Sequence, residues 1–222
     1  MRMESSSNFR EIVMGEIFPG ILYRSSHPIC DKEQVKDIVL AANNAKIKTI
    51  INFSDNNRSL KSKIIYSPWY KRIFDENGVI ALGINMKFDI MEKNFLKKVK
   101  DVIVFMANHE SPYLIHCEAG IDRTGFFSIL LGSFVGAKPD EMAKDYMLSF
   151  VGNNGYSEVD HKNGILFLEN LFAKIKGNAI EPDDDLQSLI IKYLTKKARI
   201  NEDVLEALEN KLTNNWYRAY HG

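Results

Sequence analysis

The segment YLIHCEAGIDRTG, residues 113–125, sets a cysteine and an arginine six positions apart, between a short apolar run and a second apolar run of helical density. Successive backbone N–H groups in a short loop between a strand and a helix converge, and the first helical turn adds unpaired donors and partial positive charge. Arg123 would add a planar fork that binds two oxygens at once, which a lysine cannot do. We therefore interpret residues 117–123 as a loop that binds a phosphoryl group.

Cys117 is the candidate nucleophile of this loop. A helix N-terminus and a guanidinium both favour the thiolate, which is the form of cysteine that attacks phosphorus. Thr124 is expected to hydrogen-bond the sulfur when it departs, and His116 to be buried and to orient the loop. The backbone amides that follow the cysteine are expected to bind the phosphoryl oxygens, with a glycine that lets the loop close tightly; they belong to Glu118, Ala119, Gly120 and Ile121.

The elements around the loop alternate between strand-like and helix-like segments. Short, nearly continuous apolar runs are typical of strands buried on both faces of a parallel sheet, and they occupy residues 46–53, 79–84 and 113–117. Helical spacing of apolar residues marks the segments 31–44, 92–108 and 122–134. This order predicts an α/β fold with a mostly parallel central sheet flanked by helices, and ligands gather at the carboxyl ends of such strands, where Cys117 lies.

The chain from about residue 160 onward is typical of a C-terminal helical extension. A helix beginning with Pro139 at its first position precedes it, and further helices are expected over residues 163–176, 183–198 and 201–215. Asp183 or Asp184 is the expected N-cap of the second of these, and Asn201 that of the third. A length of 222 residues and a hydrophobic content of 45% fit a single domain over residues 1–222, with the extension packed on it.

Composition narrows the classes of partner. The 29 basic and 29 acidic residues cancel, so no general field attracts nucleic acid or an anionic membrane. No apolar segment has the length of a signal peptide or of a membrane span, which favours a cytoplasmic protein, with secretion by a signal-independent route left open. The two cysteines, Cys30 and Cys117, lack zinc-like spacing, so we expect free thiols, no structural metal and no cofactor.

HCEAGIDRTG, residues 116–125, resembles the HCxxGxxR[ST]G signature of the cysteine-dependent protein tyrosine and dual-specificity phosphatases, with every fixed position present. NFRE, FPGILYRSSHP, TIINFSD and KDYMLSF resemble the NFRD, RPGxxYRS, xxxDLR and xDYxxS blocks of a bacterial and fungal branch that includes mycobacterial triple-specificity phosphatases. The C-terminal segment 193–212 resembles the closing helices of that branch. The resemblance implies a phosphatase fold and a phosphocysteine intermediate. It also implies inhibition by phosphate-like oxyanions and a phosphorylated protein or small phosphoester as substrate.

Departures from the family pattern bear on the substrate. Lipid-active members carry a lysine where this chain has Ile121, and Glu118 adds a negative charge, which weakens a phosphoinositide or inositol polyphosphate reading. We keep that reading as the alternative to a protein phosphatase. A non-catalytic phosphate-binding module is less favoured because the nucleophile and the arginine are both intact. A rhodanese-like sulfurtransferase does not explain the Arg-Thr-Gly continuation.

The proton donor for the leaving group is the least determined part of the site. The chain has no WPD motif, and Asp89 in GINMKFDI lies where related phosphatases carry their acid. A carboxylate before a helix can instead serve as a cap, and we keep that reading of Asp89 open. Asp122, inside the loop, is the second candidate. Asp55 is expected to belong to a structural turn.

Two further features each have two interpretations. Arg24 in YRSS either packs near the phosphate loop or pairs with a carboxylate. Trp69 and Tyr70 in SPWYKR either form a rim of the substrate cleft or lie in a solvated turn. Cys30 is expected to be an ordinary thiol, and the aromatic residues of segment 216–220 to pack at the end of the last helix.

Overall fold

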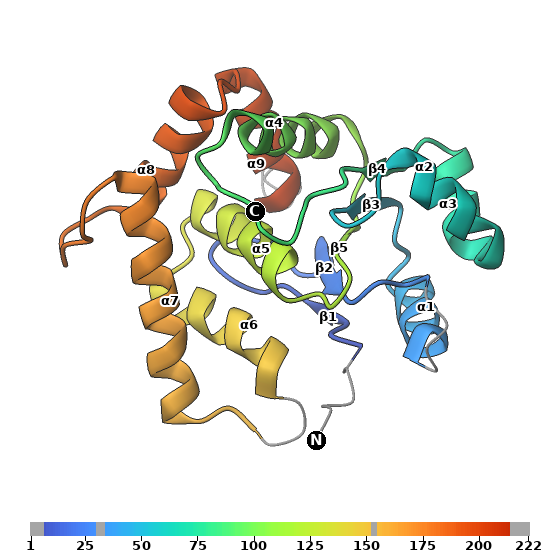
Figure 1. Cartoon of the computed structure of the whole chain (residues 1–222), viewed down its shortest axis with the longest axis horizontal. Helices are drawn as coiled ribbons and strands as arrows, with labels where there is room; N and C mark the ends of the chain where they lie inside the picture. Colours follow the sequence, from blue (N-terminus) through green and yellow to red (C-terminus); the bar gives the residue numbers. More distant parts are fainter. Residues whose placement is uncertain (1–6, 30–33, 152–154, 214–222) are drawn as a thin grey trace, which may run out of the picture.

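A computed structural model of the chain describes residues 7–29, 34–151 and 155–213 (Figure 1). A five-stranded sheet forms its centre, in the order β1-β2-β5-β3-β4. The strands are β1 (Arg10–Glu11), β2 (Leu22–Ser25), β3 (Thr49–Asn52), β4 (Val79–Ala81) and β5 (Tyr113–His116). β1 is antiparallel to β2 and every other pairing is parallel, so the predicted α/β fold with a mostly parallel sheet is confirmed.

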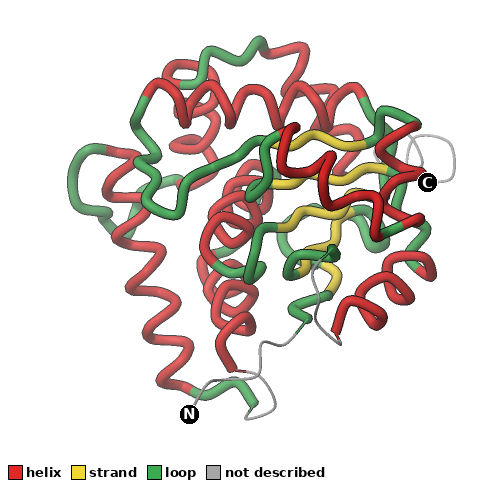
Figure 2. The backbone as a smooth tube through the Cα atoms, turned by 45° about the vertical axis from the view of Figure 1, so that its right-hand side comes forward, coloured by secondary structure: helices red, strands yellow, loops and turns green. Residues whose placement is uncertain are grey.

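Helices cover both faces of the sheet, as Figure 2 shows. The first group is α1 (Gln34–Asn44), α2 (Asn57–Lys63), the 3-10 turn η1 (Ile64–Tyr66) and α3 (Pro68–Asp75). The second group is α4 (Lys93–Asn108), α5 (Asp122–Phe134), α6 (Pro139–Val151), α7 (Glu158–Lys176), α8 (Leu186–Lys192), the π-helical turn η3 (Tyr193–Lys197) and α9 (Glu202–Thr213). No helix of the described residues is long and apolar enough to cross a membrane.

Alternation along the central strands divides the core into two clusters. Ile50 and Leu114 pack with α1, α2 and α3 on one face, whereas Ile51 and Ile115 face the larger cluster on the other. Successive side chains of a strand point to opposite faces, so a strand of consecutive apolar residues contributes side chains to both clusters. Register therefore fixes the end of β5, and with it Cys117, at the carboxyl edge of the sheet.

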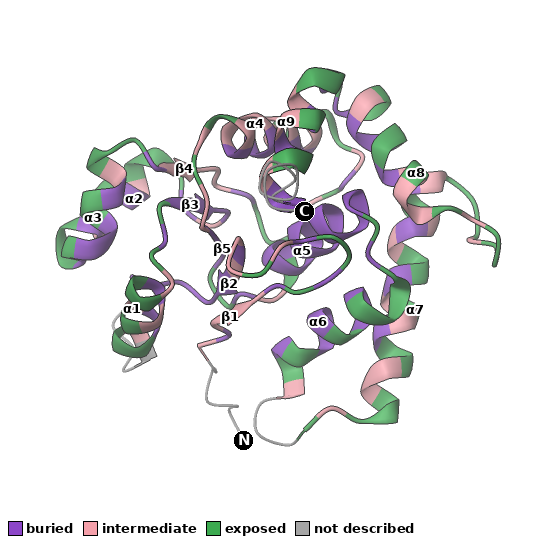
Figure 3. Cartoon of the chain, turned by 180° about the vertical axis from the view of Figure 1, so that it is seen from behind, coloured by how far each residue is buried: buried purple, intermediate pink, exposed green. Residues whose placement is uncertain are grey.

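α5 is the most enclosed helix of the larger cluster. Every residue from Arg123 to Phe134 is buried, and Figure 3 shows this helix surrounded by the others. A helix that is apolar on all sides must be covered on all sides. Its N-terminus, which carries the last residues of the loop, is thereby held rigidly against the sheet.

The C-terminal helices share this core. α7 packs on α6, α8 on α5 and α9 on α4. Their apolar residues lie in the same cluster as the sheet residues Ile51 and Ile115; they include Leu168, Phe172, Ile190, Leu205 and Leu208. Removing these helices would expose the covered faces of α4, α5 and α6.

The boundaries differ from expectation in three places. The N-cap of α8 is Asp185, whose side chain accepts a hydrogen bond from the amide of Ser188, so neither Asp183 nor Asp184 is the cap. α7 begins earlier than predicted, because Ser157 and Asp160 form a capping box. The segment around Trp69 is the helix α3, capped by Ser67 with Pro68 at its start, and not a solvated turn. The expected helix start at Asp31 lies outside the described residues.

Candidate active site

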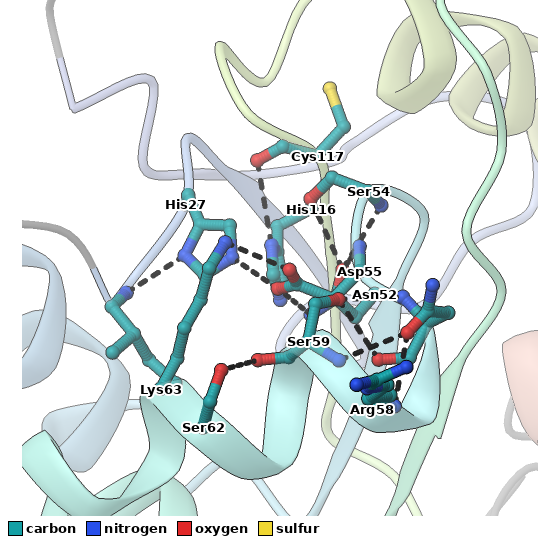
Figure 4. A network of polar contacts seen from close by, with 12 residues as sticks. His27, Asn52, Ser54, Asp55, Arg58, Ser59, Ser62, Lys63, His116 and Cys117 are labelled. Atoms are coloured by element: carbon teal, nitrogen blue, oxygen red, sulfur yellow. Dashed lines mark hydrogen bonds and ion pairs between the residues drawn. The ribbon is translucent and has the colours of Figure 1, made fainter.

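The phosphate loop, residues Cys117–Arg123, joins the end of β5 to the start of α5. Cys117 is 2% exposed. In Figure 4 its sulfur points away from the polar side chains that lie beneath the loop. The nucleophile predicted from the sequence thus lies at a helix N-terminus, where the partial positive charge stabilises an anion.

Three consecutive carbonyl groups of the loop face outward. The oxygen of Glu118 accepts from the amide of His27 at 3.0 Å, and that of Ala119 accepts from Asn8 Nδ2 at 2.9 Å. The oxygen of Gly120 accepts from Arg24 Nη2 at 2.8 Å. Each carbonyl is antiparallel to the next N–H across a planar trans peptide, so the amides of residues 119–121 face inward. Among the described residues these amides have no acceptor, and together they form a concave donor surface.

Gly120 permits the tight closure that the sequence indicates. Its φ is +71°, and a Cβ there would lie 2.5 Å from the oxygen of Ser25. Any other residue would be strained and would push the loop off β2. Gly125 serves packing in the same way, since a Cβ would lie 2.7 Å from the ring of Tyr146.

Arg123 and Thr124 present polar atoms to the loop. Arg123 is 5% exposed and donates from Nη1 to the oxygen of Ile84 at 2.8 Å, which ties the loop to the segment after β4. Its Nε and the hydroxyl of the fully buried Thr124 have no hydrogen-bond partner among the described residues. Buried donors without a partner are costly in a stable fold and are typical of binding sites.

The middle of the loop rests on the arginine cluster, which we define as Arg10, Arg24, Asp145 and Ser149. Asp145 pairs with Arg10 Nε at 3.1 Å and also with Arg24, and Ser149 Oγ accepts from both arginines. Burial alone would raise the pKa of Asp145, but the charges of Arg24 and Arg10 outweigh it and lower that pKa. Both interpretations of Arg24 made from the sequence therefore hold, because Arg24 packs against the loop and also pairs with a carboxylate.

The start of the loop rests on the histidine cluster, which we define as His27, Asn52, Asp55, Lys63, Tyr70 and His116; Figure 4 labels all of these except Tyr70. Asp55 is central: it accepts from His27 Nε2 at 2.6 Å, Lys63 Nζ at 2.8 Å and Asn52 Nδ2 at 3.0 Å. Burial alone would raise the pKa of Asp55, but these hydrogen bonds outweigh it and hold the pKa well below its usual range. His27 Nδ1 accepts from the amide of Ile29, so the proton given to Asp55 is on Nε2.

A relay of hydrogen bonds links this cluster to Cys117, the candidate nucleophile. Asn52 Nδ2 donates to the hydroxyl of Tyr70 at 3.2 Å, which leaves that hydroxyl to donate to His116 Nε2 at 3.0 Å. His116 Nδ1 lies 3.5 Å from the carbonyl oxygen of Cys117. His116 is fully buried, and desolvation, followed by repulsion from His27, lowers its pKa well below 6.5. It therefore orients the loop as a neutral ring, as the sequence predicts.

The two candidate acids lie in different surroundings. Asp89 is exposed in the turn before α4, where Oδ1 accepts from the amide of Met91 and pairs with Lys174 Nζ, both at 3.0 Å. These contacts, the Met91 amide first, lower the pKa of Asp89. Asp122 is the first residue of α5 and is exposed next to Arg123. No hydrogen bond or ion pair holds its carboxylate within the described part of the chain.

A groove of about 990 Å³ borders the loop at Glu118. Its wall is mostly apolar, with Val35, Val39, Leu40, Tyr66 and Trp69 among its residues, and it also carries Lys36 and Lys63. Trp69 lines this groove although it is only 8% exposed. The proposed rim of Trp69 and Tyr70 is wrong for Tyr70, which is fully buried beneath the loop.

Several functional contacts do not follow from the sequence. Asn8, Arg10 and Asp145 occur there only as parts of family-like blocks, and nothing in the pattern distinguishes His27. These residues come from four separate blocks of sequence that meet at one loop in the folded chain. The spacing of residues within any single block does not reveal this. Cys30 and the aromatic segment 216–220 lie outside the described residues. Within those residues no cluster of His, Cys, Asp and Glu could hold a metal ion.

Comparison with known proteins places the chain in a family. The sequence model of the tyrosine phosphatase family matches residues 1–214. Among solved structures, similarity extends to the core catalytic domain of the PP-IP phosphatase SIW14 from S. cerevisiae in complex with citrate, with 18% identity, a TM-score of 0.44 and coverage of 79% of this chain and 94% of that one. A second structure of the Siw14 catalytic core has 18% identity and a TM-score of 0.44, and covers 86% of this chain and 95% of its own. No curated protein sequence matches significantly. On the family match, the chain belongs to the tyrosine phosphatase family and is a phosphoric monoester hydrolase of the protein tyrosine phosphatase type.

Proposed function

We propose that this chain hydrolyses phosphotyrosine, and more broadly phosphoprotein esters, through a phosphocysteine intermediate on Cys117. The observation that carries the proposal is the outward orientation of the carbonyls of Glu118, Ala119 and Gly120. Because three separate partners hold them, the inward amides are fixed before substrate arrives. Donors that are fixed in advance stabilise developing charge without reorganisation, and in many enzymes this stabilisation contributes more to the rate than any other effect.

In the first step Cys117 Sγ attacks phosphorus, an S–P bond forms and the ester P–O bond breaks. The loop amides and Arg123 bind the equatorial oxygens, and a carboxylic acid protonates the leaving oxygen. In the second step water attacks phosphorus, its proton returns to that carboxylate, and Cys117 leaves as the thiolate. The hydroxyl of Thr124 donates a hydrogen bond to the departing sulfur. Phosphate-like oxyanions such as vanadate would inhibit by occupying the same donors.

Asp122 is the better-supported proton donor. Its carboxylate is free of hydrogen bonds and ion pairs within the described residues, and it directly precedes Arg123. Asp89 is instead held by the amide of Met91 and by Lys174, contacts that favour its ionised form. A general acid must be protonated before it can donate. We therefore assign Asp89 to the turn that leads into α4.

The groove beside Glu118 supports a peptide substrate. Tyr66, Val35 and Leu40 offer an apolar surface to residues that flank a phosphorylated side chain. Of its lysines, Lys63 is already paired with Asp55. A polyphosphorylated inositol ring would require several free cations, and Glu118 would repel it. Inositol polyphosphate therefore remains the second candidate.

Hydrolysis of p-nitrophenyl phosphate by four proteins tests the mechanism: wild type, Cys117→Ser, Asp122→Asn and Asp89→Asn. Cys117→Ser should abolish turnover while phosphate still binds. Asp122→Asn should lower kcat by about 10²–10³-fold, with the loss larger for poor leaving groups. Asp89→Asn should stay within about threefold of wild type and lose only stability. A large drop for Asp89→Asn with near-normal Asp122→Asn would reverse the assignment.

Substrate choice is tested by comparing a phosphotyrosine peptide with inositol hexakisphosphate. The peptide should have the higher kcat/KM. Tyr66→Ala, at a residue 80% exposed in the groove, should raise KM for the peptide and leave p-nitrophenyl phosphate unchanged. Ile65→Ala is the matched control, because Ile65 is similarly exposed (64%) but does not line the groove. Preference for the inositol compound would support the second candidate.

A further inference from the structure

A lysine-rich cavity is lined by residues that do not belong to the phosphate loop. It has a volume of about 360 Å³ and lies between the end of α7, the segment α8–η3 and the turn at Met91. Five of its lining residues are lysines: Lys174, Lys176, Lys192, Lys196 and Lys197. The chain as a whole has a formal net charge of zero. Such a local concentration of one charge within a neutral protein is a candidate anion site.

Pairing leaves most of this charge unbalanced. Lys174 pairs with Asp89 at 3.0 Å and Lys176 with Asp184 at 2.6 Å. The other three lysines have no ion pair among the described residues, and no described carboxylate lines the cavity. The carboxyl ends of α7 and of η3 contribute roughly half a negative charge each. About two positive charges therefore remain at the cavity.

The simplest alternative is that these lysines only balance the helix ends. This explains Lys174 and Lys176 in the last turn of α7 and Lys196 and Lys197 in the last turn of η3. It does not explain Lys192, because α8 runs directly into η3 and the helical segment ends five residues later, at Lys197. Lys192 therefore lies before the last helical turn, outside the range in which the partial negative charge of the helix end acts.

The π-helical turn gathers the three unpaired lysines. The amide of Ala198 donates to the oxygen of Tyr193 at 3.0 Å, an i→i+5 bond. In an α-helix Lys197 would lie roughly 140° around the axis from Lys192. The wider turn brings residue i+5 back toward the same face, so Lys192, Lys196 and Lys197 all line one cavity. π-turns within α-helices are frequent at functional sites.

The cavity also borders the segment of residues 84–91, which Arg123 contacts at Ile84. Tyr193 donates from its hydroxyl to the oxygen of Ile90 at 2.6 Å, and Met91 lines the cavity. At its other end the same segment accepts from Arg123 at Ile84. An anion at the lysines would therefore contact a segment whose far end contacts the phosphate loop.

We propose that this cavity is a second anion-binding site, separate from Cys117, which takes a small soluble polyanion bearing two or more linked phosphate groups. The proposal does not depend on the substrate or the mechanism proposed above. Linked phosphates match several ammonium groups spread over one wall, whereas a single carboxylate would engage only one or two of them.

Binding of tripolyphosphate at constant ionic strength, followed by ¹⁵N NMR of the Cys117→Ser protein, tests the proposal. Gly177 lines the cavity and Gly120 lies in the phosphate loop, so their amides report the two sites separately. The Gly177 signal should shift and saturate. In the triple variant Lys192→Ala/Lys196→Ala/Lys197→Ala its Kd should rise at least about tenfold, while the Gly120 titration should not change.

Two controls keep the outcome decisive. Lys138→Ala/Lys144→Ala/Lys162→Ala removes the same charge from three exposed lysines, which lie just before α6, within α6 and on α7, and should leave the Gly177 Kd within about twofold. Arg123→Ala should abolish the Gly120 response and keep that of Gly177, so failure of the phosphate loop would not mimic failure of this site. An unmoved Gly177 signal, equal losses in both triple variants, or binding only to vesicles that carry phosphorylated lipid would overturn the proposal.

Discussion

The arginine cluster and the histidine cluster hold neighbouring parts of the same loop with different kinds of charge. The arginine cluster holds the middle of the loop, because the guanidinium group of Arg24 donates to the oxygen of Gly120. Burial and, to a smaller extent, the charge of Arg24 lower the pKa of Arg10 to about 10, so Arg10 stays charged near neutral pH. The histidine cluster holds the start of the loop through two histidines that contact the carbonyls of Cys117 and Glu118. The comparison indicates that the first support consists of charged groups, whereas the second depends on a buried His116 ring that must stay neutral.

The largest effect is expected from Asp145→Ala, which leaves the buried Arg24 and the half-buried Arg10 without their carboxylate. Breaking a buried pair in this way costs about 3–5 kcal/mol of unfolding free energy. Because Arg24 then no longer aims at Gly120, kcat/KM should fall about 100-fold or more. Urea unfolding and p-nitrophenyl phosphate kinetics measure both. Asp140→Asn, at an exposed carboxylate of the same helix, is the control and should change neither.

Asp55→Asn breaks the corresponding centre of the histidine cluster. It keeps the shape and one acceptor but removes the charge that pairs with Lys63 and His27. The expected loss is about 1–3 kcal/mol of unfolding free energy, with a drop in kcat of about tenfold. A loss as large as that of Asp145→Ala would mean that the two clusters do not differ as described.

Tyr70→Phe interrupts the relay at one hydroxyl. It leaves His116 Nε2 without its donor and costs about 1–2 kcal/mol. Combining it with Asp55→Asn tests coupling, since members of one network are not additive. Strict additivity in this double-mutant cycle would contradict a continuous relay.

The smallest effect is the pH dependence of stability. The folded pKa of His116 lies well below 6.5, so as pH falls through 6.5 the unfolded chain takes up a proton that the folded chain does not. Unfolding free energy should therefore fall below pH 6.5, by at most about 1.4 kcal/mol per pH unit for this residue. The depressed pKa values of Asp145 and Asp55 act only as pH falls below 3.8.

Unfolding at pH 7.5, 6.5 and 5.5 compares wild type, His116→Gln and the control His161→Gln at a half-exposed histidine. Only His116→Gln should flatten the dependence between pH 6.5 and 5.5. An unchanged slope in that variant would show that the proton is taken up elsewhere.

Local patterns predicted the candidate phosphate loop and its two flanking elements. Cys117 and Arg123 lie six positions apart, and the apolar runs on either side are long enough to define β5 and α5. Asp185 was missed because three consecutive aspartates offer equivalent caps, and only Ser188, three residues on, favours the last. Ser67 followed by Pro68 is a helix-start signal that could have predicted α3.

The supports of the loop could not be predicted in the same way. Arg10, Arg24 and Asp145 are charged residues in unrelated segments, and each read alone is most often a surface residue. Their burial depends on a contact between β1, β2 and α6 that exists only in the folded chain. The amide geometry of the loop likewise depends on these partners and not on the loop sequence alone.

The most direct test of the central claim is a phosphate titration of the Cys117→Ser protein, with the amide resonances of Ala119, Gly120 and Ile121 observed. If the outward-held carbonyls fix these amides toward the phosphoryl group, all three should shift together with one Kd, and Arg24→Ala should weaken that Kd by about tenfold or more. Saturable phosphate binding that leaves the three amides unmoved would contradict the account.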